Sequence, residues 1–102
     1  MAKVIAMYRM PSDPAAFDGY YYGTHVPLAK KVPGLQRYEV TRGPILTLEG
    51  PAPYYLIATL TFASVAEIHS ALASPEGKAT AADLGNFATA GVEIFIADAE
   101  DI

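Results

Sequence analysis

The chain has 102 residues, which is the size of one domain, so we expect a single domain over residues 1–102. It has no cysteine, which excludes disulfides and thiolate nucleophiles. Seven Lys and Arg against eleven Asp and Glu give a net charge of −4 without a basic cluster, so we expect no nucleic-acid partner.

The apolar content is high for so small a domain. Hydrophobic residues make up 52% of the chain and the mean hydropathy is +0.22, whereas about 45–50% apolar residues is usual. No run reaches the ~18 apolar residues of a membrane span, and no charged-then-apolar leader is present. We therefore expect a cytoplasmic protein without membrane contact, whose surplus apolar surface is covered by another chain.

The first predicted elements are a strand and a long helix. The apolar run over residues 3–10 predicts the strand. A proline-rich turn follows, in which Ser12 or Asp13 can cap a helix that begins at Pro14. This helix should continue to about Lys31, because a Pro-Gly pair stops it soon afterwards.

The apolar face of this helix contains the best candidate for a functional residue. Four residues at spacings of four, seven and four form that face: Phe17, Tyr21, Leu28 and Val32. His25 falls four residues after Tyr21 and lies on or beside the same face. Pro27 has no N–H for the carbonyl of Gly23, and it disfavours helical geometry at the residue before it. The helix should therefore kink or loosen at His25 and leave a backbone carbonyl free.

Two strands are expected next, separated by a loop. Residues 36–42 predict a strand with Tyr38 and Val40 on one face. Residues 43–53 contain two glycines and three prolines and read as a loop or a ragged hairpin end, although residues 45–48 could extend the strand. The next segment, YYLIATLTF, is apolar on both faces, which is typical of a strand that is covered on both sides.

The last third of the chain predicts helices and a final strand. Ser64 and Glu67 form a capping box that opens a helix. Its apolar stripe should consist of three residues, Val65, Ile68 and Leu72. A short helix should restart at Ser74 and end at about Leu84, and residues 91–97 should form the last strand.

The order of these elements predicts an α+β fold. The order βαββαβ is that of ferredoxin-like domains, in which an antiparallel sheet carries its helices on one face. The other face would be bare and would hold residues such as Tyr55 and Ile57, with Tyr8 or Tyr38 as further candidates. Because a large exposed apolar patch marks an interface, we expect a homodimer whose open faces meet and enclose an aromatic-lined cavity.

Two segments resemble the signature of a known family. The first reads F-D-x-Y-Y-x-x-T-H-x-P-L-A over residues 17–29, followed by P-G-L-x-x-Y over residues 33–38. The second has S-P-E-G at residues 74–77, A-D-L at 82–84 and N-F at 86–87. With these motifs the chain resembles the EthD-like family, named for ethyl tert-butyl ether degradation. The resemblance implies a dimeric α+β barrel and a part in a degradation or secondary-metabolite pathway.

His25 is the candidate catalytic residue, because an imidazole exchanges protons near neutral pH. Tyr20, Tyr21 and Tyr38 are candidates to bind the substrate by donating hydrogen bonds to its oxygen. Thr24, in the same motif, is a further candidate binding residue. The alternative is structural: the carbonyl that the proline frees would hold the histidine, and the tyrosines would only pack in the core.

We expect no metal site and no cofactor. His69 should lie near the surface of the second helix, and neither histidine has an acidic pair at helical spacing. Glycine-rich nucleotide motifs and G-x-S-x-G are absent. Asp83 and Asn86 belong to the second family motif, but they could equally be cap and turn residues.

Three functions fit these residues. The first is a cofactor-independent enzyme that acts by proton transfer on a small hydrophobic cyclic or aromatic compound, as an isomerase, cyclase, decarboxylase or monooxygenase. The P-G-L-x-x-Y segment is also similar to that of muconolactone-type isomerases, which favours this class. The second is a non-catalytic accessory protein of an oxygenase system for ether degradation, as the family name implies. The third is a haem protein with His25 as the ligand, which some relatives of the fold suggest.

Overall fold

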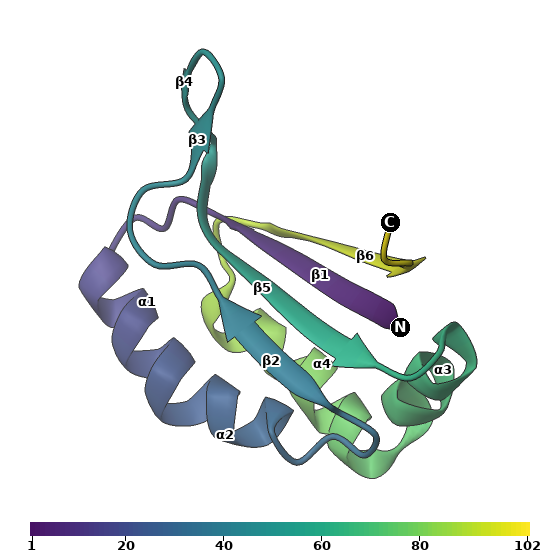
Figure 1. Ribbon diagram of the computed structural model, residues 1–102. Helices are drawn as coiled ribbons and strands as arrows, with labels where there is room; N and C mark the ends of the chain where they lie inside the picture. The colour runs from purple at the N-terminus through teal and green to yellow at the C-terminus, as the bar shows by residue number, and fades with distance from the viewer.

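In the computed structural model, which describes residues 1–102, the elements follow the predicted order, with a small hairpin added (Figure 1). They are β1 (Ala2–Arg9), α1 (Pro14–Tyr20), η1 (Tyr21–His25), α2 (Val26–Ala29), β2 (Arg37–Val40), β3 (Leu46–Thr47), β4 (Gly50–Pro51), β5 (Tyr54–Phe62), α3 (Val65–Ala73), α4 (Pro75–Phe87) and β6 (Val92–Asp98). The elements labelled α are α-helices, whereas η1 is a π-helical turn.

The main sheet has the strand order β2-β5-β1-β6, and every neighbouring pair is antiparallel. The chain passes from β1 to β2 through α1, η1 and α2, and it skips the position of β5. It passes from β5 to β6 through α3 and α4, and it skips β1. Both helical connections lie on the same face of the sheet (Figure 1). These two crossovers confirm the predicted ferredoxin-like α+β fold.

The first helical segment is continuous but contains the predicted loosening. Asp13 caps it by accepting a hydrogen bond from the backbone N–H of Ala16 at 3.1 Å. In η1 the N–H of Val26 donates to the carbonyl of Tyr21, five residues back instead of four. The interruption comes directly before Pro27, which has no N–H to donate, so the proline effect takes the form of a π turn.

The π turn changes which residues of this segment are buried. Phe17, Tyr21, His25 and Ala29 follow one another at intervals of four, and all four are buried. In a regular α-helix, three such steps would drift around the axis, and the wider turn compensates for that drift. The predicted apolar face is therefore wrong at Leu28, which is only half-buried.

The core lies between the sheet and the helices in two adjoining clusters. The first gathers the aromatic residues and consists of Ala6, Tyr8, Phe17, Tyr21, Leu56, Ala58 and Phe87. The second lies under α2 and α3 and consists of Ala2, Val4, Val32, Phe62, Ile68 and Ala71. The predicted stripe of the second helix is thus correct at Ile68, whereas Leu72 is 39% exposed and Ala71 takes its place.

The prediction for the bare face of the sheet is wrong for three tyrosines. Tyr8 alternates with the small buried residues of β1 and faces the helices, as Tyr38 does from β2. A register shift follows Tyr8 in its pairing with β5. This irregularity turns Tyr55 toward α1 as well, and it packs on the first core cluster. Of the predicted residues, only Ile57 lies on the bare face, between the buried Leu56 and Ala58.

Two segments differ from their predicted boundaries. Residues 45–48 do not extend β2 but belong to a separate hairpin, in which β3 pairs with β4. This arm projects beyond the body of the protein (Figure 1), and Leu48 at its end is fully exposed. α4 continues to Phe87 instead of ending at about Leu84, and this extra turn brings Phe87 into the core.

Candidate functional site

His25 is buried at the end of η1, with a side chain only 5% exposed. Its Nδ1 lies 2.9 Å from Oδ2 of Asp83, which projects from α4. From the sequence, the alternative to a functional role was that the backbone carbonyl freed by Pro27 would bond His25. In the structure, the carboxylate of Asp83 is the partner of His25 instead. Because a carboxylate accepts hydrogen bonds and does not donate them, Nδ1 carries the hydrogen of this bond.

Asp83 is held by three donors. Tyr20 donates from its hydroxyl to Oδ1 at 2.6 Å, and Asn86 donates from Nδ2 to the same oxygen at 3.1 Å. Burial raises the pKa of the Asp83 carboxyl, but the hydrogen bonds from Tyr20, Asn86 and His25 lower it by more, so its pKa lies below the ordinary value of 3.8. Asp83 is therefore a carboxylate at neutral pH, and it can stabilise a positive charge on the His25 ring.

A cavity of about 200 Å³ lies between the sheet and the helices beside this pair. Its wall is mostly aliphatic and includes Val4, Ala58 and Leu60 from the sheet and Ala29 and Leu84 from the helices. His25 lines the cavity and makes no bond through Nε2. Every fully buried polar side-chain atom has a hydrogen-bond partner. Nε2 has none, so it is not fully buried and must be accessible. The site thus places an imidazole that Asp83 orients in the wall of an apolar space.

Three tyrosines lie near the histidine on the helix-covered side of the sheet. The hydroxyls of Tyr21 and Tyr38 lie 2.7 Å apart, and Tyr8 packs edge-on against Tyr21 with 5.5 Å between ring centroids. Burial is the first cause that raises the pKa of Tyr8, Tyr21 and Tyr38. All three phenols therefore stay protonated at neutral pH and can act as neutral hydrogen-bond donors.

The structure brings together most of the residues that the sequence singled out. His25 and Tyr38 line the cavity, and Tyr21 lies directly behind them. Tyr20 bonds the carboxylate of Asp83 and does not line the cavity. Thr24 is exposed and lies apart from it.

Two residues of the site were missed or undervalued by the sequence analysis. Asp83 was noted only as a motif position with a cap or turn as the alternative. Tyr8 was placed on the wrong face of the sheet. The signal for Tyr8 was available, because it alternates with Val4 and Ala6, whose small side chains leave room beneath a helix layer.

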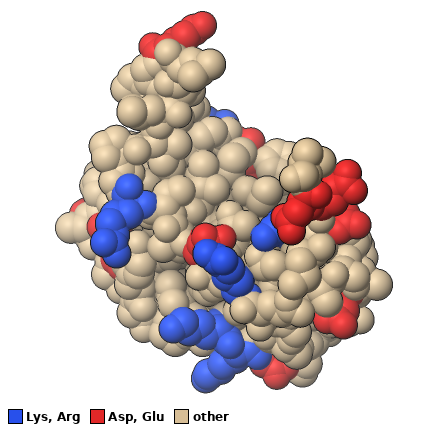
Figure 2. Space-filling view, viewed as in Figure 1, with Lys and Arg blue, Asp and Glu red and all other residues tan.

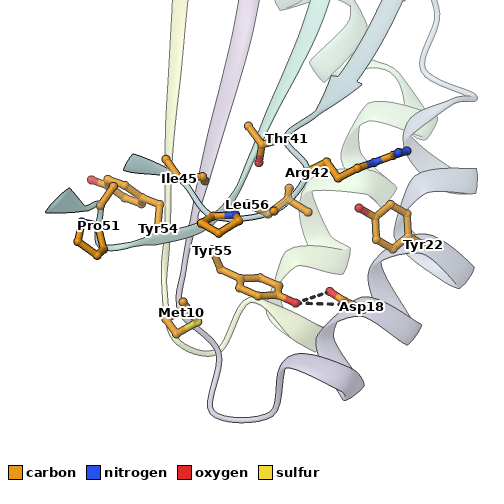
Figure 3. Close-up of a pocket in the computed structure, with 13 residues that line it drawn as sticks. Met10, Asp18, Tyr22, Thr41, Arg42, Ile45, Pro51, Tyr54, Tyr55 and Leu56 are labelled. Carbon is orange, nitrogen blue, oxygen red and sulfur yellow. Dashed lines mark hydrogen bonds between the residues drawn. The ribbon is translucent and has the colours of Figure 1, made fainter. Parts of the chain in front are cut away.

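A second, larger hollow of about 530 Å³ lies at the base of the arm (Figure 3). Tyr55 points from β5 toward α1 and donates to both carboxylate oxygens of Asp18, at 2.9 and 3.0 Å. Tyr22 lies on the same helical segment as Asp18, and Arg42 completes this part of the lining. This hollow contains no histidine, and its carboxylate is already bonded. The cavity beside His25 is therefore the better candidate site.

The residues of the site do not fit a haem group. The cavity is smaller than the roughly 300–1,000 Å³ of pockets for drug-sized ligands, and a haem is larger than such ligands. His69 is exposed on α3. No three metal-ligating side chains gather in one place.

None of the helices is long and apolar enough to cross a membrane.

The strand order, the single helix layer and the cavity beneath it define a ferredoxin-like α+β protein of the class that includes the dimeric α+β barrels. The sequence profile of the EthD domain matches residues 9–91, and the chain belongs to the EthD family.

Individual relatives agree with this assignment. The chain is 43% identical over 103 residues to an uncharacterized 11.0 kDa protein in the thcB-thcC intergenic region of Rhodococcus erythropolis, with 100% of this chain and 98% of that protein covered. The crystal structure of an EthD family protein from Bacillus halodurans matches with a TM-score of 0.90 and 34% identity, over 98% of this chain and 99% of that one.

More distant structures share the fold alone. SnoaB, a cofactor-independent oxygenase from Streptomyces nogalater, matches with a TM-score of 0.67 and 18% identity, over 99% of this chain and 94% of that one. A dimeric ferredoxin-like protein from Jannaschia sp. matches with a TM-score of 0.67 and 16% identity, over 96% of this chain and 98% of that one. Structures similar to this chain thus include dimeric proteins.

Proposed function

We propose that the protein binds a small hydrophobic cyclic or aromatic compound in the cavity beside His25 and transfers a proton to or from it without a cofactor. The observation that carries this proposal is the buried pair of His25 and Asp83 at the wall of an apolar cavity. A general base must lie within hydrogen-bond reach of the proton that it takes, and a free imidazole nitrogen beside a binding cavity can meet that requirement.

The chemistry follows from the two ring nitrogens. Asp83 holds the hydrogen on Nδ1, so the neutral ring offers the lone pair of Nε2 to the cavity. When Nε2 takes a proton, the carboxylate stabilises the resulting cation, and the apolar surroundings strengthen that attraction. The structural likeness to a cofactor-independent oxygenase is compatible with such chemistry, although at 18% identity it supports the fold only.

Exchange of the α-hydrogens of cyclohexanone for deuterium, followed by NMR, tests this proposal with a small cyclic probe. We expect wild-type protein to accelerate the exchange and His25→Gln to lower the acceleration by ~10²–10⁴-fold. His69→Gln is the matched control, because His69 is exposed on α3. A folded His25→Gln variant that keeps its rate to within about threefold, well under the contribution of a general base, would contradict the proposal.

The apolar wall also favours a second candidate, a non-catalytic accessory protein of an oxygenase system that holds a hydrophobic product or intermediate. Apolar contact alone binds such a compound and requires no chemistry. Ligand binding by the wild-type protein that His25→Ala weakens, together with no proton exchange in any probe, would favour this candidate over the enzyme.

We also propose that the protein is a homodimer joined through the bare face of its sheet. Four apolar residues of adjacent strands lie there: Ile5, Met7, Ile57 and Phe95. Polar pairs border them, with Arg9 bonded to Glu93 at one end and Lys3 bonded to Thr61 at the other. An apolar centre with a polar rim is the usual anatomy of a protein interface.

A further inference from the structure

One hydroxyl group beside the cavity has no partner. Tyr8 is only 2% exposed and lines the cavity, but its hydroxyl makes no hydrogen bond within the protein. Every fully buried polar side-chain atom of the protein has a hydrogen-bond partner. The hydroxyl of Tyr8 has none, so it is not fully buried and is accessible. An accessible hydroxyl without a protein partner can form its hydrogen bond with a ligand.

Tyr8 lies in the same group of rings as His25. Both pack against Phe87, with ring centroids 5.6 Å and 4.7 Å from it respectively. Both also pack against Tyr21, each with 5.5 Å between ring centroids. The rings of Tyr8 and His25, both of which line the cavity, therefore lie in one aromatic group.

The other polar groups in the cavity wall are already bonded. Thr80 donates to the carbonyl of Glu76 at 2.9 Å, and the hydroxyl of Tyr38 is paired with that of Tyr21. No Lys, Arg, Asp or Glu lines the cavity. The one wall residue that could become a cation is His25, and Asp83 already pairs with it, so an anionic ligand would lack a counter-charge of its own, and burying an unpaired charge is costly.

We propose that the ligand of this cavity is a small uncharged ring compound with one hydroxyl group, a phenol or an enol. Its oxygen accepts a hydrogen bond from Tyr8 while its hydrogen is donated to Nε2 of His25. This inference rests on the proposed function and adds to it the class of ligand and a binding residue, Tyr8, outside the matched motifs.

The arrangement also allows a balanced proton transfer. The ligand O–H bond breaks, its hydrogen goes to Nε2, and the electron pair stays on the ligand oxygen. The new cation on His25 faces Asp83, and the new oxyanion faces the hydroxyl of Tyr8, which remains protonated because burial raises its pKa. No oxidant or reductant enters this step.

Calorimetric titration with phenol, toluene and benzoate tests the inference, because these probes share one ring and differ in the polar group. Phenol is uncharged at pH 7, as the pKa of about 10 of the tyrosine side chain indicates. We expect phenol to bind about tenfold or more tightly than toluene or benzoate, the factor that corresponds to one well-made hydrogen bond.

Tyr8→Phe should lower the ratio of phenol to toluene affinity by about tenfold and leave the toluene affinity unchanged. Tyr54→Phe is the matched control, since the hydroxyl of Tyr54 bonds Glu93 outside the cavity, and its ratio should equal that of the wild type. If Tyr8 only filled space, Tyr8→Phe would leave the ratio of phenol to toluene affinity unchanged.

The outcomes separate the two proposals. Equal affinity of the wild type for phenol and toluene, or tighter binding of benzoate, overturns the ligand class and leaves the cavity as a binding site. These measurements need no variant, so a Tyr8→Phe protein that fails to fold does not weaken the test. Binding of none of the three probes overturns the proposed function, and the ligand class with it.

Discussion

At the scale of single residues, the charge of the Asp83 carboxylate contributes to the stability of the fold. Its folded-state pKa is lowered, so the folded protein favours the ionised form. The resulting contribution to stability is fully present above the ordinary pKa of 3.8 and is lost as the pH falls through the lower, folded-state value. Part of the acid sensitivity of the protein should therefore come from this one group.

Asp83→Asn should reduce the free energy of unfolding at pH 7 by about 1–3 kcal/mol, because it weakens a buried charge-assisted set of hydrogen bonds. It should also flatten the loss of stability at acid pH, because the amide does not titrate there. Urea unfolding at pH 7 and at several values below 5 measures both effects. Asp101→Asn, in the exposed tail, is the control and should keep the wild-type profile. A variant with an unchanged pH profile would show that Asp83 is not the group responsible.

The sequence could identify one half of this pair and not the other. His25 stood out because a polar ring on an apolar helix face is unusual, and its exposure confirms that it is buried. Its partner lies 58 residues away in the chain. Periodicity describes the face of one element and carries no information on which residue of another element it meets. The pairing could be seen only in the folded chain.

At the scale of elements, the π turn sets the direction of His25. The turn exists because Pro27 cannot donate a hydrogen bond and the chain accommodates it by a wider turn before the proline. Sequence reasoning predicted that the helix would loosen there. It could not predict the form of the loosening, because a kink, a π turn and a break all leave the same proline in the same place.

Pro27→Ala should allow an α-helical hydrogen bond at position 27 and relax the π turn toward an α-helix. The ring of His25 would then rotate away from Asp83, while the helix content stays the same. Misplacement of a catalytic group by about 1 Å can cost up to 100-fold, so we expect a clear loss of probe binding and exchange. Nitrogen NMR of the His25 ring reports the bond to Asp83 directly. An unchanged ring spectrum together with unchanged binding would mean that the π turn has no part in the site.

The corner between α3 and α4 provides a second test at this scale. A Cβ atom on Gly77 would lie 2.0 Å from the carbonyl oxygen of Ala71, which is too close for any real contact. Gly77→Ala should therefore lower the free energy of unfolding by about 1–3 kcal/mol, the range for overpacked sites. Gly85→Ala is the control in the same helix, because nothing lies within 4 Å of its Cβ position. That change should raise stability by up to about 1 kcal/mol, the helix preference of alanine over glycine. Urea unfolding distinguishes the two, and equal effects would contradict the close contact.

At the scale of the whole molecule, the order of elements was enough to predict the topology, because βαββαβ has few ways to form one antiparallel sheet. The composition of the two faces was harder to predict. One irregularity in the pairing of β1 with β5 moves Tyr55 to the helix side, and a single-residue shift in a strand exchanges its faces. The segment of β3 and β4 was predicted only as a loop or a ragged hairpin end, since two-residue strands are too short to show any alternation.

The surface left by this topology has one face without helices. Figure 2, viewed as Figure 1, shows small and separate groups of basic and acidic side chains among uncharged atoms. On the bare face, Phe95 is 51% exposed and lies opposite Ile5 on the neighbouring strand. Met7 pairs with Ile57 in the same register. Such a cluster on the open side of a sheet is the surface that a second copy would cover most effectively.

Phe95→Asp should therefore separate the proposed dimer without unfolding the chain. The side chain is half exposed in the single chain, so its replacement costs little in folding. In a two-fold dimer the new carboxylates would lose water and gain no partner, which is expensive. Light scattering at micromolar concentration should give about twice 10.9 kDa for the wild type and 10.9 kDa for the variant. Ile102→Asp, at the exposed end of the chain, makes the same kind of change outside the sheet and should leave the dimer intact. A wild-type mass of 10.9 kDa, or a Phe95→Asp variant that remains dimeric, would show that this face is not the interface.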